Sequence, residues 1–94
     1  MKNKFHQYGE SIARIITQYG GRNIRVFGSA ARGEATESSD LDILIELEAG
    51  RSLLDLIAMQ QDLEDLLGIK VDVVTEAGLS PYIRDDILEE AVPL

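Results

Sequence analysis

The chain of 94 residues carries 17 acidic and nine basic side chains, a formal net charge of −8, and 45% hydrophobic residues. This length suits a single domain, residues 1–94, with no room for a second, substrate-binding domain. The sequence has no apolar run near the roughly 20 residues of a membrane span, no signal peptide and no cysteine, so we expect a cytoplasmic protein without membrane contact. Its acidic balance and scattered basic residues argue against direct binding of a nucleic-acid polymer.

The first predicted element is an amphipathic helix over residues 3–19. Its apolar side chains recur at helical spacing, and Gly20 and Gly21 end it. A short strand, Asn23 to Phe27, follows at once.

A Gly-Ser turn follows that strand. We expect Gly28 to permit a tight turn with close backbone approach, and Ser29 to cap a short helical turn at residues 30–32. Free backbone N–H groups in such a turn suit a phosphate.

Two aspartates open the next predicted strand, residues 41–47. Alternation places Asp40, Asp42, Leu44 and Glu46 on one face and Leu41, Ile43, Ile45 and Leu47 on the other, which is the core face. Aspartate is rare in strands, and such departures concentrate at functional sites. Residues two apart rise by about 6.5 Å, so both carboxylates can converge on two metal ions about 3.5–4 Å apart. The competing interpretation is a solvated strand face.

The second half of the chain alternates helix, strand and helix. Ser52 caps a well-buried helix that ends at Gly68. The third strand, residues 70–74, carries Asp72 on the face opposite its neighbouring valines.

Ser80 and Pro81 then open a last helix over residues 82–91. This helix and the apolar end of the chain are a candidate contact for a partner protein, with core packing as the alternative.

These elements predict an α/β (α+β) fold in which a three-stranded mixed sheet, order 1-2-3, is flanked by about four helices. If Ser29 is to meet Asp40, the first two strands run antiparallel. If Asp72 joins them, the second and third strands run parallel, and residues 52–67 supply the right-handed crossover.

The combination of motifs resembles the signature of the DNA polymerase beta-like nucleotidyltransferases. It is most similar to their minimal members, the antitoxins of HEPN toxins, and it consists of Gly28-Ser29, Arg32-Gly33, Ser39-Asp40 and Asp42. The resemblance implies that magnesium, as two ions, is held by the catalytic residues Asp40, Asp42 and Asp72. It further implies that ATP is bound by Gly28, Ser29, Arg32 and Ser39.

The implied reaction transfers AMP from ATP to a hydroxyl and releases pyrophosphate. The implied acceptor is a tyrosine of a HEPN toxin encoded by a neighbouring gene, and an acidic face would favour docking to a basic partner. Two alternatives stay open. One is a transferase acting on a small molecule such as an aminoglycoside, and the other is a noncatalytic antitoxin that neutralises its toxin by binding.

Overall fold

The computed structural model describes residues 6–34 and 40–94. Three α-helices, four strands and two short 3-10 helices follow one another along them. In chain order their bounds are His6–Tyr8 (η1), Gly9–Gln18 (α1), Gly21–Phe27 (β1), Leu41–Leu47 (β2), Leu53–Leu67 (α2), Val71–Thr75 (β3), Glu76–Gly78 (η2), Pro81–Glu90 (α3) and Val92–Pro93 (β4). Within this part of the chain, no helix has the length and apolar character needed to cross a membrane.

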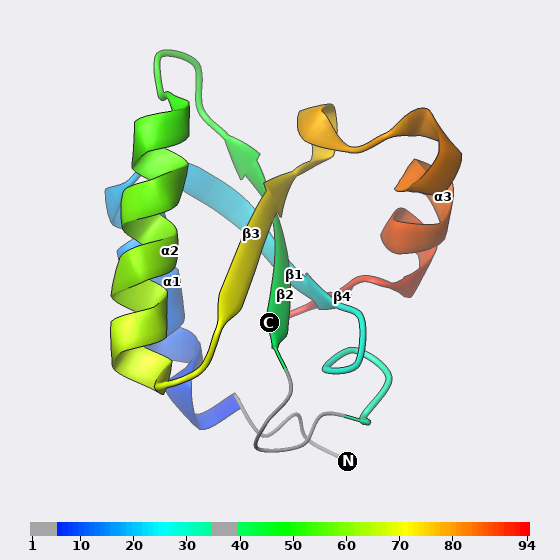
Figure 1. Ribbon diagram of the computed structural model, residues 1–94, viewed down its shortest axis with the longest axis horizontal. Helices are drawn as coiled ribbons and strands as arrows, with labels where there is room; N and C mark the ends of the chain where they lie inside the picture. The colour runs from blue at the N-terminus through cyan, green and yellow to red at the C-terminus, as the bar shows by residue number, and fades with distance from the viewer. Residues whose placement is uncertain (1–5, 35–39) are drawn as a thin grey trace.

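The strands form one mixed sheet in the order β3-β2-β1-β4 (Figure 1). β1 is antiparallel to β2, and β2 is parallel to β3 with α2 as the crossover, which confirms the predicted arrangement. The prediction of three strands is wrong at one edge, because β4 pairs with β1 at Arg25 and Val26. The prediction of about four flanking helices differs too, since the described residues form three α-helices and two short 3-10 helices. A strand of two residues that includes a proline has too little pattern to be recognised in the sequence.

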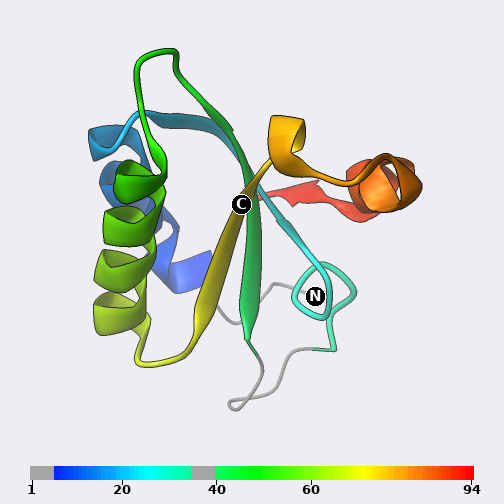
Figure 2. The ribbon, with the colours of Figure 1, turned by 45° about the horizontal axis from the view of Figure 1, so that its top comes forward.

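The main core lies between the sheet and the helices α1 and α2, which cover the same face (Figure 2). α1, α2 and the strands β1, β2 and β3 all contribute fully buried side chains to it: Ile12, Ile16, Val26, Leu41, Ile43, Ile45, Met59, Leu63 and Val71. Each such side chain stabilises the fold by about 1.5–3 kcal/mol relative to an exposed one. The face of β2 that was predicted to be apolar therefore packs on the helices, and Asp42 lies on the opposite face.

Two side chains of α2 fix the strand that carries Asp72. The backbone N–H groups of Val71 and Val73 donate hydrogen bonds to Glu64 Oε2 and Gln60 Oε1, at 3.0 and 2.9 Å. These groups lie on the outer edge of the sheet, where unpaired donors invite pairing with another chain. α2 thus closes this edge and holds β3 in register beside β2.

The other face of the sheet carries η2 and α3 (Figure 2). Leu44, which shares this face with Asp42, has no exposed surface, so the face is covered along part of its length. α3 begins at Pro81, and Ser80 Oγ accepts a hydrogen bond from the N–H of Tyr82 at 3.3 Å. The helix contributes no fully buried side chain. It therefore packs less deeply than α1 and α2, which contribute fully buried side chains.

Several predicted boundaries shift by a few residues. α1 begins at Gly9 after a 3-10 turn, and residues 3–5 of the predicted helix lie outside the described part of the chain. β1 begins two residues early because a bulge between Arg22 and Arg25, with Asn23 at φ 51°, carries Gly21 into the sheet. β3 begins and ends one residue later than predicted, and α3 one residue earlier. α2 ends at Leu67, and Gly68 caps it at φ 70°, as predicted.

Candidate active site

The chain leaves β1 through a compact turn at Gly28 and Ser29. Gly28 has φ +71°, a conformation that favours glycine, and its carbonyl accepts a hydrogen bond from the N–H of Arg32 at 3.2 Å. The carbonyl of Ser29 accepts one from the N–H of Glu34 at 2.9 Å. Residues 28–33 form successive turns and no helix, so the predicted cap of a helical turn at residues 30–32 is wrong. The tight turn itself is confirmed.

The aspartates lie beside this turn. Asp42 pairs across the sheet with Phe27 on one side and with Asp72 on the other, so the two carboxylates stand on one face of adjacent strands. A Cβ atom on Gly28 would come within 2.5 Å of Asp42 Oδ2. Asp40 precedes β2 and is exposed. Three sequence-predicted features, the glycine turn and the aspartates of β2 and β3, therefore meet at one end of the sheet.

The electrostatics of Asp42 reflect this crowding. Partial burial raises the pKa of its carboxyl, and the charges of Asp72, Asp40 and Glu90 raise it further, against a smaller opposing effect from Arg32. A carboxylate in such surroundings is stabilised by any cation that arrives between it and its neighbours.

The donors suit magnesium, which prefers oxygen ligands and is commonly held by one or two carboxylates together with waters and substrate phosphates. Within residues 6–34 and 40–94, no group of three acidic or histidine side chains is arranged so that it could hold an ion. The fit therefore depends on Asp42 and Asp72, which face each other on neighbouring strands, with Asp40 beside them. The chemistry of this donor set matches the metal implied by the sequence.

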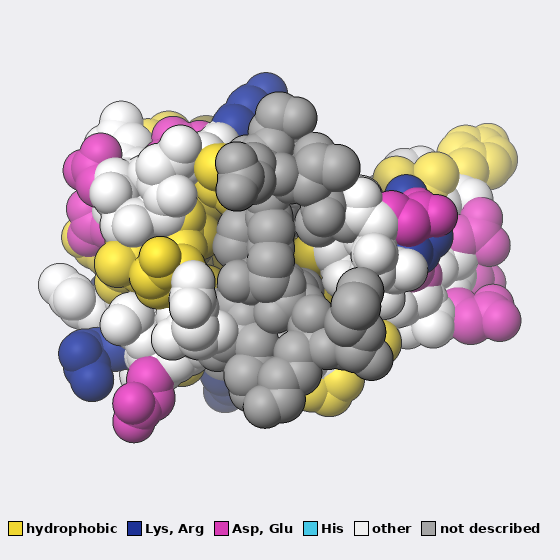
Figure 3. Space-filling view, turned by 90° about the horizontal axis from the view of Figure 1, so that it is seen from below, with side chains coloured by type: hydrophobic (Ala, Val, Ile, Leu, Met, Phe, Trp, Pro, Cys, Tyr) yellow, Lys and Arg dark blue, Asp and Glu magenta, His cyan; other side chains and the backbone are white. Residues whose placement is uncertain are grey.

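Glu90, at the end of α3, was missed by sequence reasoning. Its Oε2 accepts a hydrogen bond from the N–H of Gly28 at 3.0 Å, and its Oε1 pairs with Arg32, whose Nε also pairs with Glu34 at 2.7 Å. The Gly28 N–H bond and the Arg32 ion pair lower the pKa of Glu90. From below, acidic side chains gather on the α3 side of the molecule, with basic ones among them (Figure 3). The N–H of Gly28 is thus occupied. Within the turn at residues 30–32, the N–H of Arg32 is also occupied, because it donates to the Gly28 carbonyl, so the prediction of free N–H groups there is wrong for Arg32.

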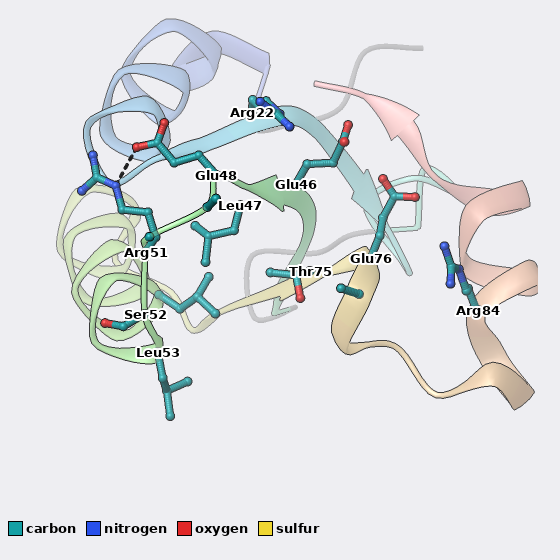
Figure 4. A pocket seen from close by; sticks show the side chains of 14 residues that line it. Arg22, Glu46, Leu47, Glu48, Arg51, Ser52, Leu53, Thr75, Glu76 and Arg84 are labelled. Carbon is teal, nitrogen blue, oxygen red and sulfur yellow. Dashed lines mark hydrogen bonds and ion pairs between the residues drawn. The ribbon is translucent and has the colours of Figure 1, made fainter.

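The remaining predicted residues and basic side chains lie elsewhere. Ser39 falls outside the described residues. Arg25 forms an ion pair with Glu76 at 2.8 Å, which holds its side chain against η2. Arg22 lines a groove of about 660 Å³ that also includes Arg51 and Arg84 (Figure 4). This groove lies at the far end of β2 from Asp42, so it is separate from the candidate site.

Comparisons with known proteins show the family to which the chain belongs. The model of the nucleotidyltransferase domain family matches residues 10–94. The chain is 47% identical over 91 residues to the protein adenylyltransferase MntA of Thermococcus cleftensis, covering 88% of this chain and 92% of that protein. It is 46% identical over 81 residues to a Methanocaldococcus jannaschii protein named, provisionally, as a protein adenylyltransferase, covering 86% of this chain and 87% of that protein.

Solved structures give the same result. One described, provisionally, as a minimal nucleotidyltransferase has a TM-score of 0.88 and 45% identity, covering 100% of this chain and 97% of that one. A crystal structure of a toxin-antitoxin with AMP-PNP has a TM-score of 0.79 and 20% identity, covering 90% of this chain and 70% of that one, and it supports the fold alone. This chain therefore belongs to the nucleotidyltransferase domain family, close to its minimal members.

Proposed function

We propose that this protein transfers AMP from ATP to a hydroxyl of a partner protein and acts as an antitoxin. The observation that carries the proposal is the contact between the Gly28 turn and Asp42, with Asp72 on the next strand. It brings a turn suited to phosphates against carboxylates suited to magnesium. Relatives named protein adenylyltransferases support the same reaction.

In this proposal the aspartates have distinct roles. Asp40, Asp42 and Asp72 are catalytic residues and hold magnesium. When bound, the metal neutralises the charge of the triphosphate and orients it for in-line attack. Asp72, on the outer of the two strands, accepts the proton of the attacking hydroxyl. The bond from that oxygen to the α-phosphorus forms as the bond to the β-phosphate oxygen breaks, and pyrophosphate leaves.

The turn holds the phosphates that leave. The hydroxyl of Ser29 and the N–H of Gly28, which donates to Glu90 in the structure, are the donors to the terminal phosphates, where negative charge builds up during the reaction. Arg32, whose side chain is half exposed and close to Gly28, adds a positive charge. Ser39 remains a predicted contact from the other side of the loop.

The partner we propose is a HEPN toxin encoded beside this chain, and the acceptor is one of its tyrosines. Fold neighbours include toxin-antitoxin structures, one of them with AMP-PNP. The formal charge of −8 would steer the protein toward a basic partner such as a ribonuclease, with association weakening as salt rises.

Calorimetry with ATP and magnesium tests the site. Wild type should bind ATP more tightly with magnesium than without it, and Asp42→Asn should lose most of that gain because it removes a metal ligand but preserves size. Glu46→Gln is the matched control: Glu46 lies on the same strand and face, accepts a hydrogen bond from Asn23 at 2.7 Å and should be dispensable for ATP. If Asp42→Asn and Glu46→Gln gained equally in ATP affinity when magnesium was added, Asp42 would not belong to the metal site.

A further inference from the structure

The end of α3 occupies the place that the proposed function gives to a phosphate. Gly28 N–H and the Arg32 guanidinium both contact one carboxylate, that of Glu90, through its two separate oxygens. A backbone N–H beside a guanidinium is a common way to bind phosphate oxygens. In the structure this turn therefore binds an anionic group, and that group is the carboxylate of Glu90 from the same chain.

We infer that Glu90 is an internal competitor for the polyphosphate of the nucleotide, and that ATP enters by displacing its carboxylate from Gly28 and Arg32. The inference rests on the proposed function for the identity of the ligand. Both anions need the same donors, and a terminal phosphate beside the Glu90 carboxylate would be repelled by it. Occupation of the turn by Glu90 and by ATP is therefore mutually exclusive.

The surroundings of Glu90 allow its side chain to leave. It is 28% exposed, and α3 contributes no fully buried side chain. The residues that follow are held independently: Val92 and Pro93 pair with β1, and the N–H of Leu94 donates to the carbonyl of Ile24 at 3.3 Å. A change of rotamer at Glu90 can thus free the turn while β4 stays in the sheet.

A glutamate in this position has two consequences for the site. Without nucleotide it holds Arg32 next to the turn, and so keeps a flexible side chain near the place where it is needed. With nucleotide it lowers apparent affinity, because part of the binding free energy is used to break the Glu90 contacts. We expect the second effect to be larger, because ATP can itself order Arg32 once it is bound.

The test measures ATP binding by calorimetry in three variants of the full chain. Glu90→Asp keeps the charge but shortens the side chain by one methylene, and Glu90→Gln keeps the length but removes the charge. Glu89→Gln removes the same charge from the neighbouring exposed position and serves as the control. Thermal unfolding monitored by circular dichroism confirms that each variant is folded.

Both Glu90 variants should bind ATP about three- to fivefold more tightly than wild type, the scale expected for removing an exposed ion pair, and Glu89→Gln should match wild type. Equal or weaker binding by folded Glu90→Asp would overturn the inference and leave the proposed function intact. Failure of wild type and every variant to bind ATP would overturn both. If a variant unfolds, NMR titration of wild type decides: ATP must shift the Gly28 amide and the Glu90 carboxyl resonances together, and a shift of the amide alone contradicts displacement.

Discussion

Replacing Gly28 by alanine tests how closely the turn must approach Asp42. Alanine at φ +71° costs about 1–2 kcal/mol for the left-handed backbone alone. Its Cβ would also lie 2.5 Å from Asp42 Oδ2, and relieving an overpacked contact typically costs about 1–3 kcal/mol more. We therefore expect Gly28→Ala to lower the free energy of unfolding by about 2–5 kcal/mol, with ATP binding lost because the Asp42 carboxylate is pushed aside.

Gly33 supplies the matched control, because it has nearly the same backbone conformation, φ +74°, but no atom within 4 Å of an added Cβ. Gly33→Ala should cost only the backbone term, about 1–2 kcal/mol. Urea unfolding gives each value. In an Asp42→Ala background the clash disappears, since the Asp42 Cβ lies 3.7 Å away, and Gly28→Ala should then cost no more than Gly33→Ala. Equal costs for the two glycines in the wild-type background, with ATP binding retained, would refute the reasoning.

Three further predictions follow from the same structure. The raised pKa of Asp42 means that the folded state binds its proton more tightly than the unfolded chain, so Asp42→Asn should be more stable than wild type at pH 7 in metal-free buffer. That advantage should shrink as the pH falls through the folded pKa and vanish below the ordinary value of 3.8, as urea unfolding at several pH values would show; a constant difference contradicts it. Ser29→Ala should weaken ATP binding about tenfold in calorimetry by removing one hydrogen bond to a charged phosphate, and unchanged affinity would exclude the hydroxyl contact. Asp55→Ala should lower the free energy of unfolding by about 0.5–1.5 kcal/mol, because it removes the carboxylate that accepts the Ser52 N–H at the start of α2, and should leave ATP binding unchanged, because this end of α2 lies at the far end of β2 from Asp42.

The sequence was sufficient for the parts of the fold governed by local pattern. The alternation of β2 predicts its buried and aspartate faces, and Ser52 and Gly68 mark the two ends of α2. The parallel pairing of β2 with β3 followed from requiring Asp72 to meet Asp42, and the register confirms that they are direct neighbours. Local pattern and one chemical requirement together predict most of the sheet.

The contacts that the sequence did not predict join residues far apart in the chain. β4 depends on the return of residues 92–93 to β1, and neither its length nor its composition marks it as a strand. Glu90 is one of several acidic residues in α3, and only the folded chain brings it to Gly28, 62 residues away in the sequence. A helical pattern places a residue on a face of its own helix, whereas the partner of that face is set by tertiary packing.

Covalent transfer of AMP is the central claim, and intact-mass analysis of the partner tests it most directly. The protein would be mixed with its neighbouring toxin, ATP and magnesium, and the toxin would then be weighed and fragmented. The account predicts added AMP on a tyrosine of the toxin with wild type and Glu46→Gln, and none with Asp40→Asn or Asp42→Asn. A tight complex that neutralises the toxin without added mass, and equally well with the aspartate variants, would contradict transfer and show that the protein acts by binding alone.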